Sequence, residues 1–237
     1  MARTYRQHGN TYFAYYLKGA LRLALYVALA VIGLFLTYYI HFAALVLLLP
    51  LFMIPKELGH FEAMKAGMLG ENVTDEILEG LPHYYHVLRD VTIRKQNGFN
   101  QLDHIVVGKK GIFVVETKYY SGAVKGRDKD VKILQKKRVK GSVYSSRFLN
   151  PAKQVTNHVV AVKRYLKLTE WKNVPVYGIV FFSHPDARVK VRSKEVRVFS
   201  ARKRGAKRLV RHIKWRRSDR RLSRKEINAV ADLLRRA

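Results

Sequence analysis

Two carboxylates and one lysine stand near the ends of two apolar segments that follow each other closely. Asp103 interrupts the segment QLDHIVV, and Glu116 and Lys118 end the segment GIFVVETK. Charged groups at the end of a segment this apolar are costly unless they are paired, ligated or exposed. Carboxylates suit a divalent metal, and an ammonium beside it can offset charge at a scissile phosphate. The three residue types therefore indicate hydrolysis of phosphodiesters.

An antiparallel hairpin would bring these side chains together. If the turn is centred between Lys109 and Lys110, with a two- or four-residue connection, Asp103 lies opposite Glu116, and Lys118 lies on the same face. Directly opposed residues have Cβ atoms ~4.5 to 5.5 Å apart. Two carboxylates at that separation repel each other unless one is protonated or a cation lies between them, and a divalent metal is the simplest resolution. A three-residue connection would shift the register by one residue and separate the pair.

A third carboxylate comes from a helix predicted from residue 56 to about residue 81, where Pro82 ends it. Glu71 falls in one arc of this helix together with Met64, Met68, Asp75 and Leu78, at 100° per residue. Glu71 therefore faces the core, or alternatively lies hydrated at the margin of the apolar stripe. A structural alternative also exists for the strand pair: a salt-bridged network with Lys118 in which Glu116→Ala would cost ~3 to 5 kcal/mol.

The remaining elements alternate between strands and helices, which predicts an α/β fold. The segments HYYHVLRDVTI, QLDHIVV and GIFVVETK read as successive strands, and one further exposed strand is expected between Val124 and Lys140. Asn150 and Pro151 open a helix to about Leu168, with Val155, Val159, Val162 and Leu166 on one stripe. VPVYGIVFF is a core strand, KVRSKEVRVF a half-exposed one, and Ser223 with Glu226 forms a capping box for a last helix.

An apolar segment without Lys, Arg, Asp or Glu runs from Leu23 to Pro55 and predicts a membrane anchor over residues 1–55. At ~1.5 Å per residue it reaches roughly 50 Å, more than one ~30 Å crossing requires. Either one helix crosses, or two short helices form a hairpin that turns near Tyr38, Tyr39 and His41. The hairpin is preferred because it keeps the basic N-terminal flank and the soluble domain in the cytoplasm.

The formal charge is +29, from 46 Lys+Arg against 17 Asp+Glu, which indicates a polyanionic partner. Cysteine is absent, which excludes thiolate zinc sites. Walker A, HExxH and GxSxG patterns are also absent, so the sequence lacks the common signals of ATP hydrolysis, zinc proteolysis and serine hydrolysis. The basic residues concentrate in a C-terminal tail and helix, 201–237. Phosphate contacts are expected from Arg202, Lys203, Arg204, Lys207, Arg208, Arg211, Lys214, Arg216 and Arg217.

The tail leaves two questions open. Trp215 could stack on a base, or it could be a packing tryptophan. The tail itself could bind nucleic acid, the anionic inner leaflet of a membrane, or nothing, as a solvated arm.

Several motifs taken together resemble the NERD family, the nuclease-related domains of the restriction-endonuclease-like PD-(D/E)xK fold. They are Gly70-Glu71, QLDHIVV, GIFVVETKYYSG, NPAKQ from Asn150 to Gln154, and YGIVFF, over roughly residues 69–182. The resemblance implies a mixed sheet flanked by helices over residues 56–200. It also implies a magnesium or manganese site that uses Asp103, Glu116 and Lys118, supported by Glu71 and Gln154. One departure is that Val131, Lys132 and Ile133 stand where such domains often carry an aromatic residue.

Two functional classes follow. The first is a membrane-tethered, metal-dependent nuclease with DNA rather than RNA as the expected substrate, in which Asp103, Glu116 and Glu71 bind the metal. The second is a catalytically silent module that binds nucleic acid or anionic lipid. Bound metal distinguishes them, because phosphate-backbone binding by the second would be unchanged by EDTA.

Overall fold

The structure is a computed structural model that describes residues 1–6, 11–39, 50–95, 98–139 and 141–237. Contacts within it divide the chain into two compact units, one of Met1–Gly9 with Leu69–Ala237 and one of Asn10–Met68. This grouping differs from the boundaries predicted after residues 55 and 200. It attaches the first residues and the whole C-terminal region to the unit that carries the candidate site.

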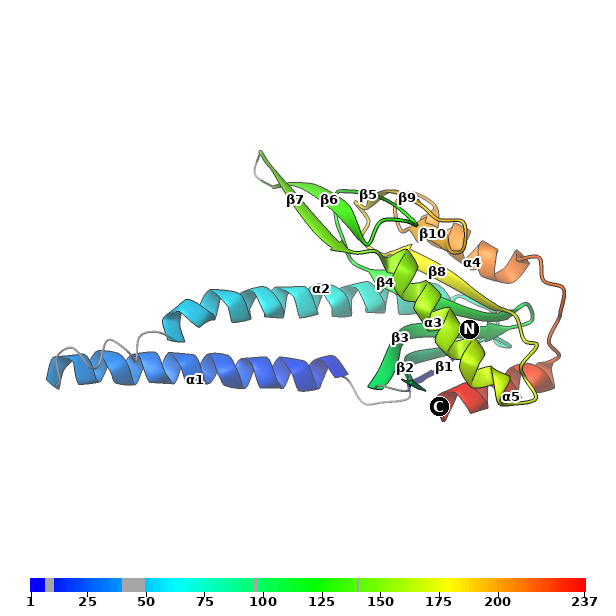
Figure 1. Ribbon diagram of the computed structural model, residues 1–237, viewed down its shortest axis with the longest axis horizontal. Coiled ribbons are helices and arrows are strands. Elements are labelled where there is room, and N and C mark those ends of the chain that lie inside the picture. Colours follow the sequence, from blue (N-terminus) through cyan, green and yellow to red (C-terminus); the bar gives the residue numbers. More distant parts are fainter. Residues whose placement is uncertain (7–10, 40–49, 96–97, 140) are drawn as a thin grey trace. The chain divides into compact units, whose positions relative to one another are not determined.

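The larger unit is built on a six-stranded mixed sheet in the order β1-β2-β3-β4-β8-β10 (Figure 1). Its strands are β1 Arg3–Arg6, β2 His86–Lys95, β3 Gly98–Gly108, β4 Gly111–Lys118, β8 Val176–Phe182 and β10 Arg197–Ser200. Strands β2, β3 and β4 pair antiparallel, whereas β1 lies parallel to β2, and β8 lies parallel to both β4 and β10. The sequence did not predict β1, which falls within the segment assigned to the anchor.

Helices cover both faces of this sheet, so the predicted α/β fold with a mixed sheet flanked by helices is confirmed. One face carries α3 (Pro151–Lys167) and α5 (Arg224–Arg235), whose buried side chains join a core with Ile105 and Val114. The other face carries residues 69–79 of α2 (Ile54–Glu79) and α4 (Gly205–Trp215). All but the last residue of β4 are buried, as its continuous apolar pattern predicted.

A second sheet has the strand order β7-β6-β5-β9, and it corrects two predictions. Its strands are β7 Ser142–Leu149, β6 Lys132–Val139, β5 Ala123–Arg127 and β9 Arg188–Arg192. The stretch predicted to hold one exposed strand thus holds β5 and β6. The single strand predicted at 190–199 is divided between β9 and β10 of different sheets, because the backbone turns where Lys194 N donates to Asp128 Oδ2 at 2.7 Å and Val196 N to Ser193 Oγ.

Both predicted helix caps are confirmed. The Asn150 side chain accepts a hydrogen bond from Ala152 N at 3.1 Å and donates to the carbonyl oxygens of Arg127 and Asp130. It therefore caps α3 and fastens this helix to the turn between β5 and β6. Ser223 and Glu226 form the reciprocal capping box of α5.

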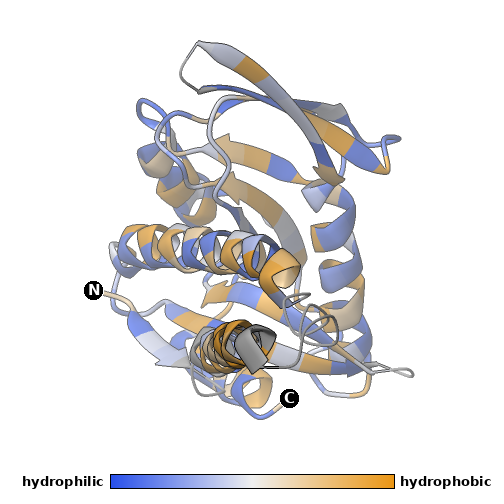
Figure 2. Cartoon of the chain, turned by 90° about the vertical axis from the view of Figure 1, so that its left-hand side faces the viewer, coloured by the Kyte–Doolittle hydropathy of each residue, from blue (hydrophilic) through white to orange (hydrophobic). Residues whose placement is uncertain are grey.

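The smaller unit contains α1 (Thr11–Tyr39) and the beginning of α2. Tyr15–Leu36 of α1 has a mean hydropathy of 2.2, which by length and composition is enough to cross a membrane. Seen end-on in Figure 2, α1 is predominantly hydrophobic. Arg22 lies 4.0 Å from Glu57 of α2. Helix α1 is continuous to Tyr39, and the rest of the turn predicted near His41 lies outside the described residues.

Candidate active site

The hairpin of β3 and β4 has the register that the two-residue connection predicted. Gly108 lies opposite Gly111, and the paired ladder continues to His104 opposite Val115. Gly111 has φ 118°, and an added Cβ would lie 2.4 Å from the carbonyl oxygen of Pro175, so the turn requires glycine. The same register brings Asp103 and Glu116 to the next position beyond the ladder.

Asp103 takes the place of a backbone partner where the ladder ends. Its Oδ2 accepts a hydrogen bond from Thr117 N at 2.8 Å. Although part of its surface is exposed, burial of the carboxyl group, followed by the charge of Glu116, raises the pKa of Asp103 to about 6. The positive charge of Lys118 offsets only part of that effect. Ionisation of Asp103 is therefore disfavoured, because it would place a second negative charge beside Glu116.

Glu116 is the most enclosed member of the site, with 1% of its surface exposed. Its Oε1 lies 2.7 Å from Lys118 Nζ, and its Oε2 lies 3.3 Å from His158 Nδ1. Burial alone would raise the pKa of Glu116, but His158 and Lys118 outweigh it and hold this pKa below its usual value. Glu116 is accordingly the ionised carboxylate of the pair.

Lys118 supplies the compensating charge. Its side chain is 23% exposed, so most of it is enclosed beside Glu116. Burial would lower the pKa of Lys118, but Glu116 and Asp103 outweigh that effect and raise the pKa. Lys118 is thus a fixed cation rather than a base at neutral pH.

The donor set fits a magnesium-type ion that is held by few protein ligands. Both buried oxygens of Glu116 lack a well-aligned hydrogen bond, despite the nearby cationic groups, and so offer lone pairs to a metal. Mg²⁺ commonly binds one or two carboxylates and completes its shell with water and substrate phosphates. Within the described ranges, no three His, Asp or Glu side chains are arranged to hold a metal, so Asp103 and Glu116 would act as a pair.

The two supporting residues lie on helices that cover opposite faces of the sheet. Glu71 is half-buried in α2, and its neighbour Thr74 contacts the hydroxyl of Thr117 at 3.1 Å, on the face of β4 opposite to Glu116. Among the described residues, Glu71 forms no three-residue metal-binding group with Asp103 and Glu116. Gln154 is half-buried one turn before His158 in α3, the helix that reaches Glu116.

His158 is the site residue that the sequence reasoning missed. It lies in the buried stripe of α3 with Val155, Val162 and Leu166, next to Val159, which packs against the same core as predicted. A histidine at helical spacing between core residues was the signal, since an imidazole facing a core requires a polar partner. Here that partner is Glu116.

A separate ion-pair network lies on the opposite face of the sheet. Asp75 Oδ1 is 2.8 Å from both His104 Nε2 and Arg89 Nε, and Arg89 also contacts Glu79 at 2.8 Å. The prediction of His104 as a core histidine is confirmed, since this residue is 1% exposed and its Nε2 is bound to Asp75, although its Nδ1 has no hydrogen-bond partner in the described part of the chain. The network fixes α2 to β2 and β3.

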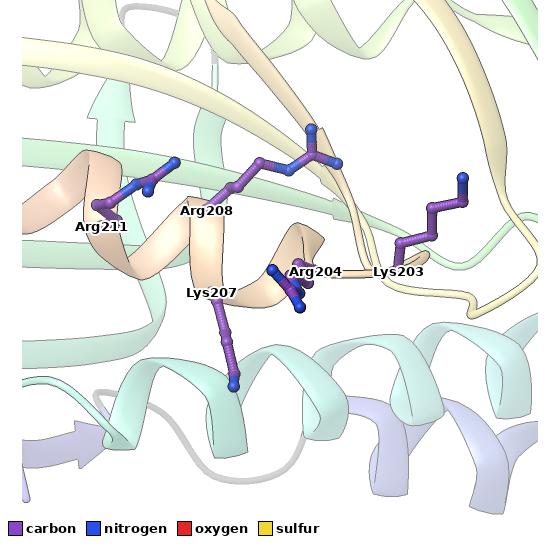
Figure 3. A pocket seen from close by; sticks show the side chains of 5 residues that line it. All are labelled: Lys203, Arg204, Lys207, Arg208 and Arg211. Atoms are coloured by element: carbon purple, nitrogen blue, oxygen red, sulfur yellow. The ribbon is translucent and has the colours of Figure 1, made fainter.

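The basic C-terminal residues are more ordered than a tail. Residues 205–215 form α4, which inserts Leu209 and Ile213 into the core. Five cations of α4 and the preceding turn surround a hollow of about 660 Å³: Lys203, Arg204, Lys207, Arg208 and Arg211 (Figure 3). Among the described residues none of these cations pairs with a carboxylate. Trp215, next along the same helix, is 74% exposed, which contradicts the packing alternative.

The residues of this site fall within a match to a known protein family. Residues 66–183 match the nuclease-related domain, NERD. The chain is also 35% identical over 141 residues to a Bacillus anthracis protein described as uncharacterized, an alignment that covers 56% of this chain and 60% of that protein. No solved structure matches. Asp103, Glu116 and Lys118 thus lie within the part of the chain that matches the nuclease-related domain.

Proposed function

We propose that the chain is a membrane-tethered, magnesium- or manganese-dependent nuclease that hydrolyses phosphodiester bonds of nucleic acid, DNA in preference to RNA. The observation that carries this proposal is the convergence of Asp103, Glu116 and Lys118 where the pairing between β3 and β4 ends, within the residues that match a nuclease-related domain. Helix α1 supplies the tether, and the larger unit works on the cytoplasmic side.

Each side chain has a distinct role in this proposal. Asp103 and Glu116 would hold the metal, which when bound stabilises charge on the phosphate and lowers the pKa of water. Asp103 must release its proton first, which favours activity above its pKa of about 6. His158 holds the Glu116 carboxylate in place. Lys118 Nζ lies beside the Glu116 carboxylate and would offset the negative charge of the reacting phosphate.

The cations around α4 supply affinity without sequence preference. They are exposed and unpaired among the described residues, and phosphate neutralisation by such groups gives salt-dependent binding. These cations lie on the face of the sheet that α4 covers, opposite to Glu116. A nucleic acid that contacts both the cations and the site would therefore wrap around the domain.

Cleavage assays test the proposal with the full chain in neutral detergent. Plasmid, linear DNA and RNA are incubated with Mg²⁺ or Mn²⁺, with EDTA as the metal-free condition. We expect Asp103→Asn and Glu116→Gln to lose cleavage while both remain folded, because each removes one metal-binding carboxylate. The exposed Glu170 provides the matched control, and Glu170→Gln should cleave like the parent protein.

A catalytically silent binding module is the second candidate, and one observation favours it. The Lys118 ammonium lies 2.7 Å from Glu116 and already neutralises it without a metal. On this alternative, no nucleic acid is cleaved under any metal condition, and salt-sensitive binding is the same with and without EDTA. Metal-dependent cleavage that both carboxylate variants lose would exclude it.

A further inference from the structure

The outer face of the second sheet is a dense array of positive charge. Along one row across its strands, Lys190 of β9 pairs with Lys125 of β5, then Leu134 of β6 and Arg147 of β7 follow. Because side chains alternate along a strand, every second residue of each strand shares this face. Nine cations do so: Lys125, Arg127, Lys132, Lys136, Arg138, Arg147, Arg188, Lys190 and Arg192. We call this surface the basic sheet face.

Burial separates the two faces of the sheet clearly. All nine cations are exposed, whereas Val124, Ile133 and Gln135, at the alternate positions of β5 and β6, are buried. The four strands contain no Asp or Glu. Of the nine cations, none forms an ion pair with a carboxylate in the described parts of the chain. The charge of this face is therefore left without an internal partner.

Fold stability does not account for this arrangement. Like charges directly opposite each other on neighbouring strands are destabilising, and Lys125 faces Lys190 while Arg127 faces Arg192. Lysines protect exposed strand edges from wrong pairing, but β5 and β6 are the central strands of this sheet. A face that keeps like charges opposite each other between β5 and β9, and carries further cations on the inner strand β6, is suited to an external polyanion.

The basic sheet face is held firmly to the candidate active site. Strand β5 begins at Ala123, shortly after Lys118 ends β4. In the connection, the Ser121 carbonyl accepts a hydrogen bond from Gln135 Nε2 at 2.8 Å, and the Tyr120 ring packs on Phe148 with centroids 4.1 Å apart. The hydrogen bond and the ring contact fix the sheet relative to the end of β4.

We propose that the basic sheet face binds the sugar-phosphate backbone of duplex nucleic acid and presents it to the site at Glu116 and Lys118. The identity of the polyanion rests on the proposed function. Cations two residues apart on a strand are separated by roughly 6.6 Å, and neighbouring strands by about 4.8 Å, so the strands form a rigid grid that contacts several phosphates at once. Contacts to phosphates fix position and orientation and carry no sequence information.

A salt titration of binding tests this assignment. The triple variant Lys125→Gln, Arg147→Gln, Lys190→Gln removes the charge of the central row. The control variant Lys163→Gln, Arg164→Gln, Lys172→Gln removes the same charge from exposed positions on α3 and after it. The full chain in neutral detergent binds labelled duplex DNA in EDTA, so that cleavage plays no part. We expect the slope of log Kobs against log salt to weaken by about 2.7 for three lost phosphate contacts, and the control to keep the parental slope.

Other outcomes would overturn the assignment. They are an unchanged slope in the triple variant, an equal change in the control, or a parent protein that does not bind duplex DNA. A triple variant that binds DNA normally but loses association with mixed micelles containing anionic lipid would assign the face to a membrane instead. If the slope falls as expected while no metal condition gives cleavage, the proposed nuclease activity fails and the binding surface stands.

Discussion

Asp103 Oδ2 accepts a hydrogen bond from Thr117 N at 2.8 Å at the point where the ladder between β3 and β4 ends. The side chain thereby replaces a backbone acceptor and lies between the two strands. This position brings the Asp103 carboxylate close enough to Glu116 for each charge to affect the other. The hairpin thus holds two carboxyl groups at a separation at which their negative charges repel each other.

The stability of the folded protein should depend on the titration of Asp103. Its pKa rises from 3.8 to about 6 on folding, so between these values the folded chain retains a proton that the unfolded chain has released. The free energy of unfolding therefore falls as pH rises through this window, by at most about 3 kcal/mol at 1.36 kcal/mol per pKa unit. Asparagine cannot ionise, so Asp103→Asn should gain stability relative to the parent protein between about pH 4 and about pH 7.

Urea unfolding at a series of pH values measures this difference. Glu116 acts in the opposite direction, because its lowered pKa gives stability that is lost as pH falls, but this contribution is common to the parent and the variant in first approximation. Glu170→Gln, at an exposed position, is the control and should follow the parent curve. Parallel curves for Asp103→Asn and the parent would show that Asp103 is not the destabilised carboxyl group.

Divalent metal should stabilise the folded state. An ion that binds only the folded protein raises its stability by ~2.7 kcal/mol at a hundredfold excess over Kd. We expect Mg²⁺ or Mn²⁺ to raise Tm, EDTA to reverse the increase, and Glu116→Gln to abolish it. Glu71→Gln serves as a second comparison, because Glu71 was predicted as a ligand but lies in the helix on the opposite face. A metal-induced increase that Glu71→Gln also abolishes would show that Glu71 reaches the metal.

Loss of the Lys118 charge should be costly in the absence of metal. Lys118→Met leaves Glu116 buried beside Asp103 without the ammonium at 2.7 Å. Breaking a buried pair from one side costs ~3 to 5 kcal/mol, because the remaining charge is uncompensated. The double variant Lys118→Met, Glu116→Gln should recover much of that loss, and unfolding free energies of the four proteins measure the coupling. Additive effects of the two substitutions would exclude a direct pair.

The sequence was sufficient for the hairpin because two simple constraints coincide there. Period-two alternation set the face of each side chain, and the two-residue connection set the register, so Asp103, Glu116 and Lys118 could be placed before the fold was known. His158 escaped because helical positions three and four apart are both compatible with one stripe. Val159 packs against the core as predicted, and only the packing on the sheet shows that its neighbour His158 is buried as well.

Elements without an internal pattern could not be predicted. Strand β7 is exposed along almost its entire length, so it lacks the alternation that identifies a strand and is defined by its pairing with β6. Strand β1 pairs with a partner about eighty residues away along the chain, and nothing in four residues indicates that partner. In α4, the apolar stripe consists of Leu209 and Ile213 among basic residues, so net charge obscured a helix that packing stabilises.

Trp215 should contribute to binding of single strands and not to folding. Its side chain is 74% exposed at the end of α4, beside Arg208, Arg211 and Arg216, around a hollow of about 380 Å³. Base stacking on an aromatic ring is worth ~1 to 3 kcal/mol per base. Trp215→Ala should therefore weaken single-stranded DNA binding by that amount, affect duplex binding less because its bases are already stacked, and change the free energy of unfolding by under about 0.5 kcal/mol. Leu168→Ala, at an 88% exposed position after α3, is the control for loss of apolar surface. Equal losses for single and double strands would instead make Trp215 a support for the neighbouring arginines, which contact the phosphates common to both.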